Sequence, residues 1–422
     1  MNLKKDRIAG VFTAVLVWVL MGALHAPAEA QHDGLRFGKF DIDAGLTMKG
    51  EYNDNVFYDH EDEKDDFIFI VTPAIGVDYT MSPGNYLNMG YAVDLAAYID
   101  YTDNNYDRHN PFVNLELSSP TGVYLKLTDS LVHTDDPYGS LNEYRLGRST
   151  ERWNNTLYAA AGYTFAQKYG IELSYDGFVQ RYDETIDEWQ DVDDNAYGVA
   201  LYYQFSPKTR VFGQYQYREV EYPEQNDGAS LIFGPDYNSQ NSQDNTQNLF
   251  FVGADFRPLA KIKGQVKLGY GRIAYDNRLD RFDNPYEDED TWVAETRIGY
   301  QMRERTRIDF VLNRSFKSSS DEVDEAPGYF DTLVSAGVVQ DMKHRLQGSL
   351  SLDWNILDYQ EGPGPEKYFD IYRANVGLKY IINEFLDTGI LYQFRDKVAS
   401  RSAYEDDEYT INSIALVFSA EY

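Results

Sequence analysis

Residues 345–359 read RLQGSLSLDWNILDY and alternate between apolar and polar side chains. The leucines and Trp354 fall on one side of an extended chain, and the serines and Asp353 fall on the other. Residues 291–301 and 372–380 repeat this pattern. Because successive side chains of a strand point to opposite faces, each stretch predicts a strand with one apolar face and one polar face.

The predicted strands are long. Strands of a soluble sandwich usually have five or six residues, whereas these run about ten to sixteen. A strand that crosses a bilayer needs roughly nine to eleven residues at its tilt. The lengths therefore favour strands that span a membrane over strands that pack against a second sheet.

Eight short turns divide the chain after its first forty residues, and acidic loops, most of them longer, fall between them. The turns lie at residues 81–84, 118–122, 166–168, 206–209, 257–260, 302–305, 341–344 and 382–384. Eight turns with nine loops at the opposite end predict eighteen strands. Short turns at one end and longer loops at the other are typical of outer-membrane barrels. We therefore predict an all-β fold, a single antiparallel up-and-down transmembrane β-barrel of about 18 strands. Its turns and both ends of the mature chain would be periplasmic, and its acidic loops extracellular.

Residues 1–30 are predicted to be a signal peptide, and residues 31–422 the barrel. Three cations lie within the first seven residues, residues 8–24 are apolar, and Ala28-Glu29-Ala30 has the pattern of a cleavage site. A membrane anchor is the alternative. The rest of the chain has no apolar stretch of the length that a membrane helix requires. There is no cysteine, which excludes disulfides and lipid attachment at the cleavage point.

Aromatic residues lie close to the short turns, at the depth expected of the girdle at a membrane interface. The predicted girdle contains Tyr79, Tyr86, Tyr124, Phe165, Tyr169, Phe205, Phe212, Phe256, Tyr300, Tyr380 and Phe385.

The last strand ends on the final residue, with Phe418 and Tyr422 on the same face as the apolar residues before them. A terminal aromatic after alternating apolar residues resembles the signal that outer-membrane barrels present to the barrel assembly machinery; the alternative is a chain that simply stops on a strand. Together with the leader, it predicts the Gram-negative outer membrane as the location, with outer-membrane lipid and that machinery as partners.

The formal net charge is −31, and it becomes −32 if the leader leaves with its three cations and two anions. A surface of this sign repels nucleic acid. Much of the acidity lies in the predicted loops, at residues 59–66, 183–194, 287–290, 321–325 and 405–408. Residues 59–66 could hold Ca²⁺, but they lack the spacing of a calcium loop, and a solvated loop is the favoured interpretation. With six histidines and no catalytic motif around them, we predict no catalytic residue, resident metal or cofactor.

Charged residues on the polar faces are candidates for lining a pore, because barrels of this size leave an aqueous channel. The candidates are Asp94, Glu116, Glu172, Asp176, Arg218, Lys263, Lys267, Arg297, Arg307, Arg373, Lys379 and Arg395. At similar depth they would form an acidic wall facing a basic one. Alternatively, they pair with neighbours such as Glu295, Asp309 and Asp353. The longest connections, about residues 133–152 and 222–244, are candidates for a constriction.

Residues 52–56 read YNDNV, followed by KDDFI at 64–68 and PAIGV at 73–77. This opening hairpin resembles the putative β-barrel porin 2 family. Members of that family often accompany exopolysaccharide export systems, so the resemblance implies an outer-membrane barrel and, more loosely, polysaccharide and periplasmic export components as partners. Tyr52, Asn53, Asp54 and Asn55 match the family motif. Asn and Asp also stabilise turns through their own backbone, and this structural role is favoured over ligand binding.

Three functions remain open at this point. The first is passage or export of a polar polymer such as an exopolysaccharide. The second is a general or sugar-selective diffusion porin. The third is a surface scaffold or adhesin with a closed lumen. No enzyme activity is predicted.

Overall fold

The computed structural model describes residues 35–137, 149–185, 187–223, 244–259, 261–275, 287–318, 328–360 and 366–422. The predicted signal peptide and the acidic residues 321–325 lie outside these ranges. Within them, no helix is long and apolar enough to cross a membrane. The described chain is almost entirely strand.

The strands are β1 (Leu35–Phe37), β2 (Phe40–Asn53), β3 (Asp66–Ser82), β4 (Asn85–Tyr98), β5 (Tyr106–Ser118), β6 (Val123–Thr134), β7 (Arg152–Phe165), β8 (Tyr169–Tyr182), β9 (Val192–Ser206), β10 (Thr209–Glu221), β11 (Asn245–Leu259), β12 (Ile262–Tyr275), β13 (Glu289–Arg303), β14 (Thr306–Ser318), β15 (Gly328–Asp341), β16 (Leu346–Tyr359), β17 (Tyr368–Ile381), β18 (Leu386–Ala399) and β19 (Tyr409–Glu421). Three short 3₁₀ helices lie in the connections: η1 (Thr102–Asn104), η2 (Glu188–Gln190) and η3 (Ser402–Asp407).

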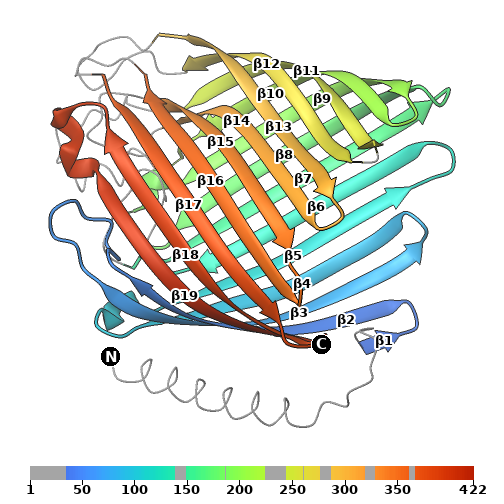
Figure 1. The fold of residues 1–422 in the computed structure, drawn as a ribbon. Helices are drawn as coiled ribbons and strands as arrows, with labels where there is room; N and C mark the ends of the chain where they lie inside the picture. Colours follow the sequence, from blue (N-terminus) through green and yellow to red (C-terminus); the bar gives the residue numbers. More distant parts are fainter. Residues whose placement is uncertain are drawn as a thin grey trace.

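Strands β2 to β19 form one closed antiparallel ring of tilted strands (Figure 1). Each pairs with its neighbours in the chain, and β19 pairs with β2 from Ser413 opposite Asn53 to Glu421 opposite Gly45. The three-residue β1 only forms a hairpin with β2. All eight predicted turns coincide with connections between strands, so the predicted barrel of 18 strands is confirmed. We call the two ends of the barrel the turn end and the loop end.

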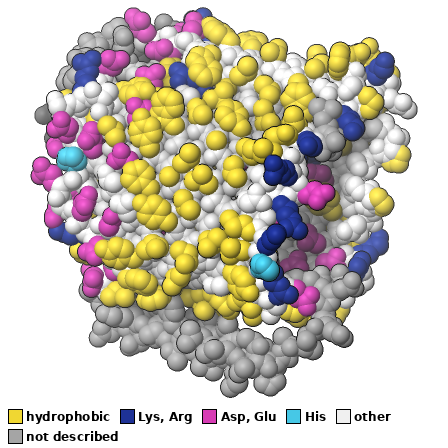
Figure 2. Space-filling view, viewed as in Figure 1, with side chains coloured by type: hydrophobic (Ala, Val, Ile, Leu, Met, Phe, Trp, Pro, Cys, Tyr) yellow, Lys and Arg dark blue, Asp and Glu magenta, His cyan; other side chains and the backbone are white. Residues whose placement is uncertain are grey.

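The two faces of the wall differ as the alternation predicts. Leu350, Leu352 and Trp354 are 43%, 52% and 42% exposed on the outer face. Ser351 and Asp353 point the other way. Hydrophobic side chains cover the middle of the visible outer wall, and charged ones gather toward its ends (Figure 2). Such a band is the surface that a lipid bilayer covers.

The predicted girdle is wrong at three positions. Tyr86, Tyr124 and Phe212 lie on the inner face, because their register partners are the inner-face residues Glu116, Gly162 and Gly253. The ring of Tyr124 covers Gly162, where a Cβ atom would collide with it. Nearness to a turn therefore predicts an aromatic residue but not its face, since an inward ring fills the space that a glycine leaves.

Candidate functional site: the barrel lumen

All twelve candidate charges lie on the inner face. Residues that are opposite one another in the register share a face, and the row Asp176, Ala196, Arg218, Gln247 and Ile273 runs across five strands. The same test, strand by strand, places the other ten candidates inside. The register therefore gives their direction, and their part in passage stays a prediction.

Several of these charges are paired locally. Lys267 is 2.8 Å from Glu295, Arg307 is 2.8 Å from Asp309, and Lys379 is 2.6 Å from Asp387. These contacts favour the interpretation of local pairs over that of two opposed walls.

Most of the other candidates also have polar neighbours. Thr72 donates a hydrogen bond of 2.6 Å to Asp94. The register places Arg108 opposite Asp94, Lys126 opposite Glu116, and Gln265 opposite Arg297. Lys263 lies opposite Gly299, and Arg373 lies between Asp353 and Arg395. Charges of both signs are thus mixed around the ring.

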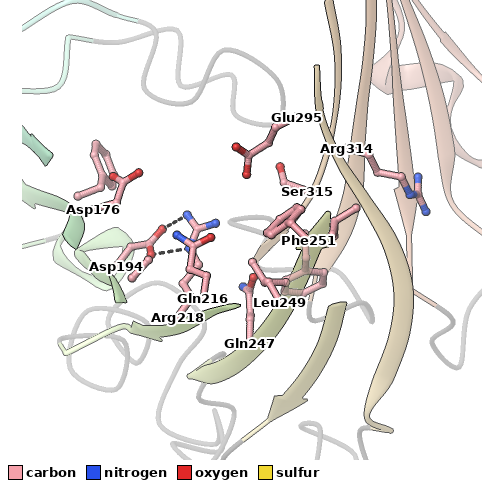
Figure 3. Close-up of a pocket in the computed structure, with 14 residues that line it drawn as sticks. Asp176, Asp194, Gln216, Arg218, Gln247, Leu249, Phe251, Glu295, Arg314 and Ser315 are labelled. Atoms are coloured by element: carbon pink, nitrogen blue, oxygen red, sulfur yellow. Dashed lines mark hydrogen bonds and ion pairs between the residues drawn. The ribbon is translucent and has the colours of Figure 1, made fainter. Parts of the chain in front are cut away.

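A pocket of about 120 Å³ opens on the inner face of β8 to β14. Arg218 donates to both carboxylate oxygens of Asp194, with Nε to Oδ1 at 2.6 Å, and Asp176 lies beside this pair (Figure 3). Glu295 projects into the pocket from the opposite side. Phe251 forms part of the floor, and the Lys267 ammonium lies 3.9 Å from its ring centroid. The pocket combines a bidentate ion pair, two further carboxylates and an aromatic platform.

A larger pocket, of about 480 Å³, lies near the turn end on β5 to β10. Glu172 lines this pocket and accepts hydrogen bonds from Tyr124 at 2.6 Å and Tyr202 at 3.0 Å. The Arg210 guanidinium lies 3.8 Å from the Tyr202 ring centroid, and its Nε donates to Asp255 at 2.9 Å. These hydroxyls and the stacked guanidinium were not among the sequence candidates. Alternation across β6, β9 and β10 could have identified them.

The motif at residues 52–55 fastens the first loop to the strand that closes the barrel. Asn55 is fully buried, and its Nδ2 donates to the carbonyl oxygens of Asp59 and Thr410 at 2.7 and 3.1 Å. Its Oδ1 accepts the N–H of Asp59 at 2.9 Å. Asp54 accepts the backbone N–H of Asn412 at 2.7 Å. These contacts give Asp54 and Asn55 a structural role, which is the interpretation that the sequence favours over ligand binding. Tyr52 faces outward and donates to Asp65 at 3.1 Å.

Beyond the motif, the loop folds into the lumen. Val56 is fully buried and packs against Ile68 and Tyr98 of the inner wall. Tyr58 meets the ring of Tyr409 at 5.1 Å between centroids, and the Arg395 guanidinium lies 5.6 Å from its centroid. Burial raises the pKa of Tyr58 above its ordinary value, although Arg395 acts in the opposite direction. The described part of this loop narrows the loop end of the lumen.

The loop-side ends of β14 and β15 also narrow the lumen. Phe316 packs against Ile273 and Tyr275 on the inner face of β12. Asn245 of β11 donates to the Ser318 hydroxyl at 3.0 Å. The loop-side end of β14 therefore bends inward and packs against the inner face of β12. The constrictions expected at residues 133–152 and 222–244 lie largely outside the described residues.

Two acidic regions bear on cations. In residues 59–66, Asp59 accepts the N–H groups of Glu61 and Asp62, so its carboxylate stabilises the turn. His133, Glu151 and Asp183 bring ligand atoms within 4.8 Å of one another on the outer wall, with both carboxylates exposed. Surface Ca²⁺ stays a prediction.

A family model described as putative beta-barrel porin 2 matches residues 27–421, nearly the whole chain. The chain belongs to this family. The resemblance inferred from residues 52–77 is thereby confirmed, and the molecule is an outer-membrane β-barrel with a porin-like lumen.

Solved structures similar to this porin are outer-membrane proteins. OpdK from Pseudomonas aeruginosa has a TM-score of 0.45 and 9% identity, covering 90% of this chain and 99% of its own. OccAB4 from Acinetobacter baumannii has a TM-score of 0.43 and 11% identity, covering 90% and 98%. The alcaligin receptor FauA from Bordetella pertussis has a TM-score of 0.42 and 10% identity, covering 90% and 76%. No curated protein matches the chain.

Proposed function

We propose that this porin lets a polar polymer, an exopolysaccharide, pass through the outer membrane. The observation that carries the proposal is the chemistry of the lumen, where rings alternate with ion pairs and amides at both pockets. In the proposed orientation the turns and both chain ends face the periplasm, so polymer enters at the larger pocket. Periplasmic export components would deliver it there.

Paired charges suit a sliding polymer. Arg218 and Lys267 are already held by carboxylates, so neither offers a strong unneutralised site to a passing chain. Sugar hydroxyls can exchange hydrogen bonds with these carboxylates and with the amides of Gln216 and Gln247. Inner-face rings give apolar contact without fixed direction. Many weak contacts in sequence allow movement where one strong contact would halt it.

The proposal is tested in two arms. Protein reconstituted in planar bilayers should conduct ions, and soluble exopolysaccharide from the native host should reduce the current when added on the turn side. Deletion of the gene should abolish secreted polymer while leaving uptake of small sugars unchanged. Conductance with normal polymer secretion and impaired sugar uptake would indicate a diffusion porin instead. Failure to conduct, together with normal secretion, would indicate a closed scaffold.

The acidic loops predict cation selectivity. Residues 59–66 and 405–408 are described at the loop end and are rich in carboxylates. Such a mouth concentrates cations, and salt weakens the effect as the Debye length falls from about 10 Å at 0.1 M to about 3 Å at 1 M. The reversal potential in a KCl gradient should therefore show K⁺ preference that declines toward 1 M. Anion preference at low salt would contradict this assignment.

A further inference from the structure

The hydrogen-bonded ladder between β13 and β14 stops before either strand ends. It runs from Arg303 opposite Thr306 to Ala294 opposite Arg314. Residues 289–293 continue to pair with β12, and residues 315–318 continue to pair with β15. We call the place where these two segments part the seam. Other ladders have short internal gaps, such as that between Gln265 and Leu268 of β12, but they pair again beyond them, whereas the segments of the seam do not.

The inner side of the seam is apolar. Val293 packs with Leu249 and Phe251, and each of the three is at most 7% exposed. Phe316 packs beside them with Ile273. Inner walls of membrane barrels are ordinarily polar. The pocket of about 120 Å³ extends from Arg218 across this surface to residues 314–316, so it joins the lumen to the seam.

The outer side of the seam is closed by an arginine. The Arg314 guanidinium lies 4.9 Å from the Trp292 ring centroid and 4.7 Å from that of Phe330. Figure 3 shows it on the opposite side of the strands from Glu295. Its nearest carboxylate, on Asp358, is 4.0 Å away, and its buried Nε has no acceptor among the described residues. Its Nη1 donates to the Thr332 hydroxyl at 2.5 Å, so Nε is the donor that retains capacity for an anion on the outer side of the seam.

We propose that the seam is a lateral binding site for a long-chain fatty acid. The carboxylate would pair with Arg314, and the chain would pass between β13 and β14 onto the apolar side of the pocket, which Leu249, Phe251 and Val293 form. The seam lies at the loop-side ends of β13 and β14, and Trp292 beside it is 50% exposed on the outer face. The fatty acid would therefore come from the lipid leaflet on the loop side. A pocket of this volume has room for the end of one chain. The inference does not depend on passage of polymer.

Trp292 can report the binding directly. The variant W153F/W189F/W354F leaves Trp292 as the single tryptophan of the mature chain, and W153F/W189F/W292F leaves Trp354. Trp354 is the matched control, since it is 42% exposed on the same outer face. With protein in lipid vesicles, 9,10-dibromostearate should quench Trp292 saturably and quench Trp354 only in proportion to its partitioning. The dibrominated alcohol of equal length should quench both equally.

Two further substitutions locate the site. Arg314→Gln should weaken the saturable quenching at least tenfold by removing the cation. Val293→Phe should abolish it by filling the pocket from the lumen side while Arg314 remains. Heat-modifiable migration on gels verifies that each variant is folded. Equal, unsaturable quenching of both tryptophans, or saturable binding unchanged in folded Arg314→Gln and Val293→Phe, would overturn the proposal. Neither result bears on conductance or polymer secretion.

Discussion

Asn55→Ala should lower the free energy of unfolding by about 3 kcal/mol, because a fully buried amide loses three hydrogen bonds to backbone groups. Those bonds fasten the first loop to β19 where it closes on β2. Urea titration of protein refolded in detergent, followed by tryptophan fluorescence, measures the change. The freed loop should also raise the noise of single-channel current.

Asn375→Ala is the matched control for this substitution. Asn375 is half-buried on the inner face, donates to Ser351 at 3.0 Å and accepts from Gln393 at 3.0 Å. Water in the lumen can replace both bonds, so the cost should stay below about 1 kcal/mol. Equal destabilisation by the two variants would show that Asn55 does not fasten the first loop to β19.

Arg218→Gln should convert the smaller pocket into a divalent-cation site. The register places Asp194 diagonally beside Asp176, and Arg218 is the cation that separates their charges. Removal of one unit charge at about 4 Å changes the interaction with an ion by roughly 1 to 4 kcal/mol. Block of the current by Mg²⁺ should therefore tighten by roughly fivefold to several hundredfold.

Two further variants test whether Mg²⁺ binds in the smaller pocket. Arg218→Gln with Asp194→Asn should return Mg²⁺ block to the level of the unmodified protein. Arg307→Gln removes another inner-face cation, but one that is half-exposed and paired within its own strand, and it should change block little. Tight block in the double variant would place the divalent ion elsewhere in the lumen.

Much of the fold can be predicted from local sequence patterns. Backbone geometry fixes the period of a strand at two residues, so the alternation in residues 345–359 predicts both their conformation and which side chains share a face. The short turns set the strand count, which the ring from β2 to β19 confirms. The direction of all twelve charged candidates follows from the same alternation.

The contacts between strands distant in the chain could not be predicted. Alternation predicts Phe316 on the outer face, yet Phe316 packs against Ile273 of the inner face, because β14 bends inward at the seam. Tyr124 and Phe212 turn inward to cover glycines on neighbouring strands, and pairing register is invisible in one sequence. Asn55 is recognisable as a turn residue, but its bond to Thr410 depends on closure of the barrel.

Movement of solutes through the lumen is tested most directly by a single introduced cysteine, because the natural chain has none. Gln216→Cys places a thiol in the smaller pocket, and Val199→Cys places one on the outer face. A charged, water-soluble methanethiosulfonate should reduce single-channel current in discrete steps with Gln216→Cys and leave Val199→Cys unchanged. Absence of current steps from folded protein, or equal effects at both positions, would contradict a conducting lumen.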